Sequence, residues 1–73
     1  MTPTQCKMAR AALDMSRADL AQLVELGPTT VTRFEQQDGA TTGRGTVELI
    51  RIALERTGRI EFVGDDTVRY ISD

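Results

Sequence analysis

The chain has no histidine, no tryptophan and a single cysteine among its 73 residues. The absence of histidine removes the commonest catalytic base and metal ligand, and Cys6 alone can form neither an intramolecular disulfide nor a Cys/His zinc site. The sequence pattern places no base beside this thiol, which is typical of a small core residue. We therefore expect no enzymatic activity, no metal and no cofactor, and the scarcity of cysteine favours a cytoplasmic setting.

Long hydrophobic runs are also missing. The apolar stretches are a few residues long, far short of the ~18 residues that a membrane-spanning helix requires. Polar and apolar side chains alternate too closely for a signal peptide in the first residues, MTPTQCKMARAAL. We expect no membrane partner. The length suits one domain that buries only about 60% of its unfolded surface, so a dimer interface would add stability.

Positive charge is scarce, because the chain has nine Lys and Arg and eleven Asp and Glu, which gives a net charge of −2. This balance disfavours nucleic acid, because phosphate binding is largely electrostatic. The excess of acid is local, however. Residues 1–58 hold seven basic and seven acidic side chains, whereas residues 59–73 hold four acidic and two basic ones. A nucleic-acid partner therefore requires the basic side chains of residues 1–58 to gather on one surface.

Helical periodicity and helix-end signals predict four helices. Ser16 followed three residues later by Asp19 matches a capping box. Pro28 suits the first position of a helix, and Gly58 suits a left-handed C-cap. The expected helices are residues 4–13, a short helix opening at Ser16, residues 28–36 and residues 46–57, with an exposed glycine-rich loop over residues 37–45. The side chains expected to face the core are Cys6, Met8, Ala9, Ala12 and Leu13, then Leu20, Ala21, Leu23 and Val24, and finally Val47, Leu49, Ile50, Ala53 and Leu54.

After Gly58 the periodicity changes from helical to twofold. Residues 59–63 and 67–71 are rich in β-branched and aromatic side chains and are separated by Gly64-Asp65-Asp66, which predicts a β-hairpin. An isolated hairpin is only marginally stable, so these strands must pack on the helices or on a partner chain. The pattern leaves open whether they pair within one chain or across a dimer. One apolar face is expected from Ile60, Phe62, Val68 and Tyr70.

The third predicted helix has two different faces. Val31 and Phe34, three residues apart, form an inward stripe. The opposite face carries short hydrogen-bonding groups and one guanidinium, with no carboxylate: Thr29, Thr32, Arg33 and Gln36. Such a face could be an ordinary solvated one, but it also suits the DNA major groove, where arginine can bond to guanine O6 and N7. Either Thr29 or Thr32 could contact a thymine methyl group.

The four predicted helices, with two short helices joined by a sharp turn at their centre, resemble the phage repressor and Cro-like (XRE-type) helix-turn-helix family over residues 5–54. Ala21 stands at the small position where the two central helices nearly touch. The apolar positions of the family motif hold Leu20, Val24, Leu26, Val31 and Phe34. The resemblance implies a mainly α, lambda-repressor-like four-helix domain in residues 1–58. Residues 59–73 would add a short C-terminal β-hairpin or strand extension.

The resemblance also implies roles for single residues. Arg10 and Glu35 stand where relatives carry a structural ion pair, and Ser16 and Arg17 stand where relatives contact phosphates. Two positions depart from the family pattern, since Glu25 replaces the glycine of the turn and Gly27 replaces the serine that caps the next helix. The residues expected at DNA are Ser16, Arg17, Pro28, Thr29, Thr30, Thr32, Arg33, Gln36 and Arg44, of which Arg44 could equally be a mobile surface arginine.

The function that follows from the resemblance is sequence-specific DNA binding by a transcriptional regulator. A homodimer would place its two third helices in successive major grooves of a palindromic operator, about 10 bp apart. The alternative is a protein-binding module of antitoxin or anti-activator type on the same scaffold. A regulatory protein partner is compatible with both, because the chain has no room for a sensor domain. The residues expected at the dimer contact are Ile52, Ile60, Phe62, Val68 and Tyr70.

Overall fold

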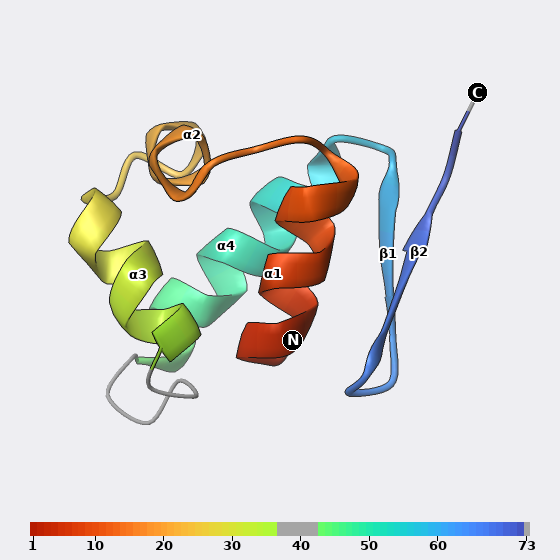
Figure 1. Ribbon diagram of the computed structural model, residues 1–73. Helices are drawn as coiled ribbons and strands as arrows, with labels where there is room; N and C mark the ends of the chain where they lie inside the picture. Colours follow the sequence, from red (N-terminus) through yellow and green to blue (C-terminus); the bar gives the residue numbers. More distant parts are fainter. Residues whose placement is uncertain (37–42, 73) are drawn as a thin grey trace.

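The protein is mainly helical, with four helices and a two-stranded antiparallel sheet. The computed structural model describes residues 1–36 and 43–72. The elements are α1 (Pro3–Ala12), α2 (Arg17–Leu23), α3 (Pro28–Gln36), α4 (Arg44–Arg56), β1 (Ile60–Val63) and β2 (Thr67–Tyr70). Helices α1 and α4 lie between the β-hairpin on one side and the α2–α3 pair on the other (Figure 1). Within the described residues, no helix has the length and apolar character needed to cross a membrane.

The helix ends follow local hydrogen-bonding signals. Ser16 and Asp19 form the predicted capping box, in which each side chain accepts from the backbone N–H of the other at 3.0 Å. A second capping box, between Thr2 and Gln5, opens α1 and was not predicted. Gly58 follows the C-cap of α4 with φ +76°, the left-handed conformation that the sequence indicated.

Helix α4 begins earlier than predicted. Its N-cap is Gly43 and its first residue is Arg44, two residues before the expected start at Thr46. Arg44 is therefore in the first helical turn, and its expected place in a loop was wrong. The glycines at 43 and 45 obscured this start, because glycine is a poor helix former but an acceptable N-cap. Residues 37–42 of the expected loop lie outside the described residues.

The strands pair within the chain. The register sets Ile60 opposite Tyr70 and Phe62 opposite Val68, so these four side chains share one face as the twofold period indicated. The hairpin packs with β2 against α1 and β1 against α4. Gln5 fixes this contact, because its side-chain Nε2 donates to the carbonyl oxygens of Gly64 at 2.9 Å and Thr67 at 3.0 Å, although Gln5 is fully buried.

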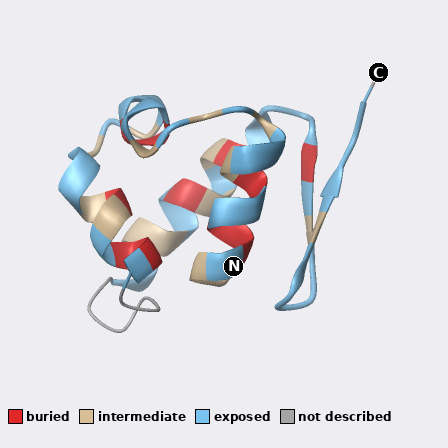
Figure 2. Ribbon diagram, viewed as in Figure 1, coloured by how far each residue is buried: buried red, intermediate tan, exposed pale blue. Residues whose placement is uncertain are grey.

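One core joins the helices and the hairpin. Figure 2 marks the buried residues in red; they lie on the four helices and on β1, and they include the polar Gln5 and Glu35 besides the hydrophobic core. Leu13, Met15, Val24, Leu26, Val47, Phe62 and Val68 are partly buried against it. The buried hydrophobic side chains are Cys6, Ala9, Leu20, Ala21, Val31, Phe34, Ile50, Leu54 and Ile60.

Several apolar side chains that were expected in the core lie at the surface instead. Met8 is 38% exposed, Leu23 47% and Leu49 53%, and Ala12 is also exposed. Helical periodicity assigns a residue to an arc of the helix, but it does not show how much of that arc the neighbouring elements cover. Two of these exposed residues, Leu23 and Leu49, line one surface groove between α2 and α4.

Candidate nucleic-acid interface

Helices α2 and α3 pack closely against each other across a tight turn. Ala21 is 1% exposed, and its carbonyl oxygen accepts a hydrogen bond of 2.9 Å from the N–H of Leu26. The chain reverses at Glu25, whose φ of 58° is left-handed, as expected for a position where glycine is usual. A non-glycine residue there costs on the order of 1 kcal/mol, which the burial of the helix pair offsets. The small side chain at Ala21 permits the close approach that presents α3 to solvent.

The outward face of α3 carries Thr29, Arg33 and Gln36, all exposed. Pro28, at the first helical position, is exposed as well. Thr32 was expected on this face but is half-buried. Thr30 is half-buried too. The inward stripe is as predicted, with Val31 at 0% and Phe34 at 2% exposure.

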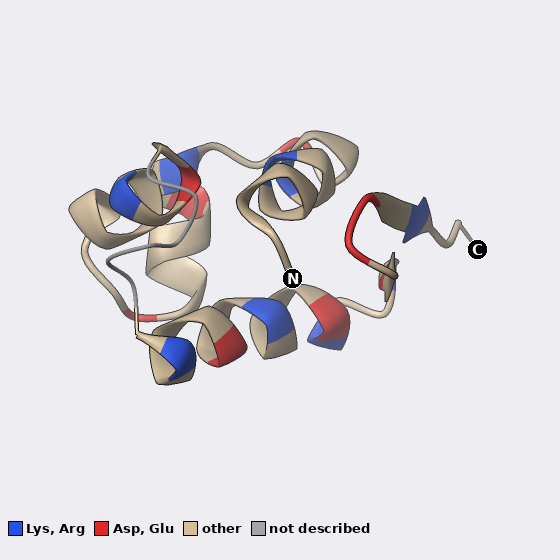
Figure 3. Cartoon of the chain, turned by 90° about the horizontal axis from the view of Figure 1, so that it is seen from below, with Lys and Arg blue, Asp and Glu red and all other residues tan. Residues whose placement is uncertain are grey.

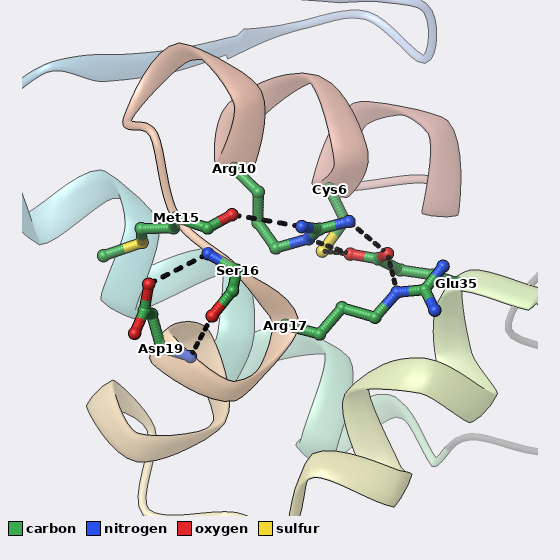
Figure 4. Close-up of polar contacts among 7 residues, drawn as sticks. All are labelled: Cys6, Arg10, Met15, Ser16, Arg17, Asp19 and Glu35. Atoms are coloured by element: carbon green, nitrogen blue, oxygen red, sulfur yellow. Dashed lines mark hydrogen bonds and ion pairs between the residues drawn. The ribbon is translucent and has the colours of Figure 1, made fainter.

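Glu35 is the only acidic residue of α3, and it does not reach the outward face. Its side chain is fully buried, and its two carboxylate oxygens accept hydrogen bonds from both neighbouring helices (Figure 4). Arg10 of α1 binds in a forked manner, from Nε to Oε2 at 2.7 Å and from Nη2 to Oε1 at 2.7 Å. Arg17 of α2 donates from Nε to Oε1 at 3.0 Å. The ion pair that the resemblance implied for Arg10 and Glu35 is therefore part of a larger cluster.

Cys6 completes this cluster. Its thiol lies at 0% exposure and donates to Glu35 Oε2 across 3.1 Å. Burial, followed by the hydrogen bond to Glu35, raises the pKa of the Cys6 thiol, so it stays protonated and keeps its role as a donor. The positions of Cys6 and Arg10, four residues apart, could have indicated a shared helix face in the sequence. The contribution of Arg17 had no comparable signal.

The cluster holds Glu35 in its ionised form. Burial acts to raise the pKa of Glu35, but the hydrogen bonds from the two arginines and the thiol outweigh it and keep this pKa below its ordinary value of 4.5. Two guanidinium groups share one carboxylate, so the cluster carries a net positive charge at neutral pH. Arg17 presents this positive charge to solvent, because its side chain is 37% exposed, whereas that of Arg10 is 16% exposed.

The lowered pKa of Glu35 predicts a pH-dependent difference between the protein and its Glu35→Gln variant. Ionised Glu35 favours the folded state, so its contribution is complete above about pH 4.5 and is lost as the pH falls through the lower pKa of the folded protein. Urea denaturation between about pH 7 and pH 3 should therefore show a large difference in unfolding free energy that shrinks on acidification. A difference that stays constant across this range would contradict the assignment.

The guanidinium group of Arg17 uses only part of its hydrogen-bonding capacity within the fold. It uses Nε for Glu35, and its terminal nitrogens have no hydrogen-bond partner among the described residues. Ser16, beside it, is exposed, although its side chain already caps α2. Arg17 was expected at phosphate from the resemblance, and the structure leaves its two terminal nitrogens available for such a contact.

The remaining basic residues divide into paired and exposed ones. On α4, Arg51 forms ion pairs with Glu48 at 2.6 Å and with Glu55, so its positive charge is compensated by two carboxylates. Lys/Arg and Asp/Glu segments alternate along α4 (Figure 3). Arg44, at the N-terminal end of α4, is exposed. Among the described residues, the exposed basic side chains without an ion pair include Lys7 of α1, Arg33 of α3, and Arg44 and Arg56 of α4.

The residues expected at a dimer contact do not form one surface. Ile60 is only 4% exposed and belongs to the core of its own chain, so little of its side chain is accessible to a partner. Phe62 and Val68 are partly buried against the same core. Tyr70 is 46% exposed, and Ile52, at 41%, lies on α4. The apolar face of the hairpin is mostly covered by the helices because the chain is too small to fill its core without it.

Comparisons of the chain with protein-family models, with curated proteins and with solved structures find no match. The described residues contain no group of three or more Cys, Asp or Glu that could hold a metal ion.

Proposed function

We propose that this chain is a sequence-specific DNA-binding protein of the helix-turn-helix class, similar to the phage repressor and Cro-like regulators. In this proposal α2 and α3 form the helix-turn-helix and α3 enters the major groove. The protein would act as a transcriptional regulator, with a homodimer bound to a palindromic operator. DNA binding, the class of fold and the regulatory role are proposals that the following observations support.

The observation that carries the proposal is the burial of Glu35. An exposed acid on α3 would repel the phosphate backbone, but this carboxylate is enclosed and neutralised by Arg10 and Arg17. The exposed face of α3 is left with neutral hydrogen-bonding groups and Arg33. A helix of this composition is suited to base edges, because hydroxyl, amide and guanidinium groups match the donors and acceptors of the major groove.

The proposed roles follow from position and chemistry. Arg33 would bond bidentately to a guanine, while Thr29 and Gln36 would contact neighbouring bases or thymine methyl groups. Arg17 at the start of α2 and Arg44 at the start of α4 would bind phosphates and fix the orientation of the protein on the duplex. Pro28, Thr30, Thr32 and Ser16 would lie at the margin of this contact.

The proposal can be tested by selection from a randomised duplex library on the full chain. The enriched duplex is then titrated by fluorescence anisotropy at two salt concentrations. An enriched sequence whose affinity falls steeply with salt would support the proposal, because phosphate binding releases counterions. Failure to enrich any sequence, together with no salt-dependent binding, would contradict it and favour a protein-binding module of antitoxin or anti-activator type.

Arg33→Ala is expected to weaken binding to the selected duplex by about 1–3 kcal/mol and to relax the preference at one base position. The matched control is Arg69→Ala, which removes the same charge from β2, on the opposite side of the molecule from α3 (Figure 1). The Arg69 side chain is 68% exposed, so the control should fold normally and retain its base preferences. Equal affinities for the two variants would show that α3 is not the reading helix.

A further inference from the structure

An apolar groove of about 360 Å³ lies between the C-terminal end of α2 and the middle of α4. Leu23 contributes from α2, and Leu49 and Ile52 contribute from α4. These three side chains are 47%, 53% and 41% exposed, which gathers three of the large exposed hydrophobic residues of the described structure in one place. A concentration of this kind is typical of an interaction site, whereas single exposed apolar residues are not.

The groove adjoins the core at Val24, which is partly buried against it, but the large exposed apolar residues of the groove lie outside the core. Leu49, Ile52 and Arg56 follow one another at helical spacing along α4, whereas the fully buried Ile50 and Leu54 lie on another side of the same helix. Helix α4 is therefore apolar on two sides, of which the fold covers only one. A surface helix with one partner needs a single apolar stripe.

The charges of the groove indicate which partner would cover it. Glu25 and Arg56 also line it, and neither forms an ion pair with another described residue. One acid and one base give the groove no net charge. In a twofold interface, when residue i of one copy contacts residue j of the other, residue j of the first copy also contacts residue i of the second, so Glu25 of each chain can meet Arg56 of the other.

We propose that this groove is the dimer interface and that its occupant is a second copy of this chain. Leu23, Leu49 and Ile52 of the two copies would pack together, flanked by two Glu25–Arg56 ion pairs. The hairpin is less suitable, because Ile60 is buried in its own core and Phe62 and Val68 are mostly covered. No residue of α3 lines the groove, so self-association would leave Thr29, Arg33 and Gln36 open.

This interface does not depend on DNA binding, and the two proposals can fail separately. Sedimentation of the full chain without DNA should show a dimer that dissociates on dilution. Ile52→Lys places a charge in the groove and should raise the dimer dissociation constant by about tenfold or more. Val63→Lys is the matched control, since Val63 is a 45% exposed apolar residue on β1 and lies outside the groove. Circular dichroism confirms that each variant is folded.

A charge-exchange experiment tests the pairing itself. Glu25→Lys and Arg56→Glu should each weaken self-association, because each places like charges opposite one another in its own homodimer. An equimolar mixture of these two variants should recover dimers, since both cross-pairs in the mixed dimer have opposite signs. Recovery in the mixture, with weakness in each variant alone, would support the proposal.

Three results would overturn it: a mass of one chain at every concentration up to the solubility limit, a dimer that Ile52→Lys leaves intact, or a mixture of the charge variants that stays monomeric. Loss of the dimer in Val63→Lys alone would assign the contact to the hairpin and would likewise refute the groove. DNA titrations on the same variants report separately on α3, which none of these substitutions alters.

Discussion

Replacing Glu35 with alanine is expected to lower the unfolding free energy by about 3–5 kcal/mol. The carboxylate is fully buried and accepts hydrogen bonds from Arg10, Arg17 and Cys6. Its removal leaves Arg10, which is only 16% exposed, without its counter-ion. The two guanidinium groups would then repel each other with no carboxylate between them, and that of Arg10 would remain largely enclosed. This loss is a large part of the 5–15 kcal/mol that stabilises a typical domain.

The matched control for this prediction is Glu48→Ala. Glu48 also forms an ion pair with an arginine, at 2.6 Å, but its side chain is 54% exposed. Exposed pairs contribute about 0–1 kcal/mol, so this variant should unfold almost as the original protein does. Urea denaturation of both variants at neutral pH measures the difference. Equal stabilities would show that the cluster around Glu35 contributes no more than a surface ion pair.

The Glu35→Ala variant also distinguishes a role of Glu35 in folding from a role in DNA binding. If Glu35 acts through the fold alone, Glu35→Ala should bind DNA normally once it is folded, for example in a stabilising osmolyte. A variant that keeps its melting temperature and loses only DNA binding would overturn the structural assignment of Glu35. In that case the carboxylate would belong to the binding surface.

Much of the candidate site was accessible from the sequence because it depends on local spacing. Ser16 and Asp19, three residues apart, fix the start of α2, and Val31 and Phe34 fix the inward face of α3. These features need only helical geometry and hydrogen-bonding chemistry. The left-handed conformation of Glu25 fits a position where the resemblance implies glycine, whereas the sequence analysis gave no indication of the left-handed Asp14, with φ 55°.

The features that the sequence could not give are contacts between distant elements. Arg17 lies in α2 and meets Glu35 only because α1, α2 and α3 converge on one point. Gln5 in α1 binds the hairpin turn about 60 residues away, and no periodicity indicates that contact. Likewise, the apolar arc of α4 contains Leu49 and Leu54 alike, and only packing shows that one is exposed and the other buried. The periodicity of a helix therefore predicts its apolar face, but the tertiary structure determines which residues of that face are buried.

Removal of residues 59–73 is expected to unfold the protein at room temperature rather than only to weaken a dimer. The deletion takes Ile60 out of the core, removes the cover that Phe62 and Val68 provide, and leaves the buried Gln5 amide without its two acceptors. Full burial of one such apolar side chain stabilises by about 1.5–3 kcal/mol, so these three contribute about 3–6 kcal/mol when the two partly buried ones count as half. That loss approaches the whole stability of a domain of this size.

The comparison of two point variants makes this prediction sharper than the deletion alone. Ile60→Ala should cost about 2–4 kcal/mol, because it opens a cavity in the core. Val63→Ala, on the same strand but 45% exposed, should cost less than about 0.5 kcal/mol. Thermal unfolding followed by circular dichroism measures the deletion and both variants. A folded, fully stable fragment of residues 1–58 that fails only to dimerise would show that the hairpin is a separable dimerisation element. The alternative result is that the fragment loses cooperative unfolding and that Ile60→Ala is much less stable than Val63→Ala. This result would show that the hairpin completes the core and that the position of α3 depends on it.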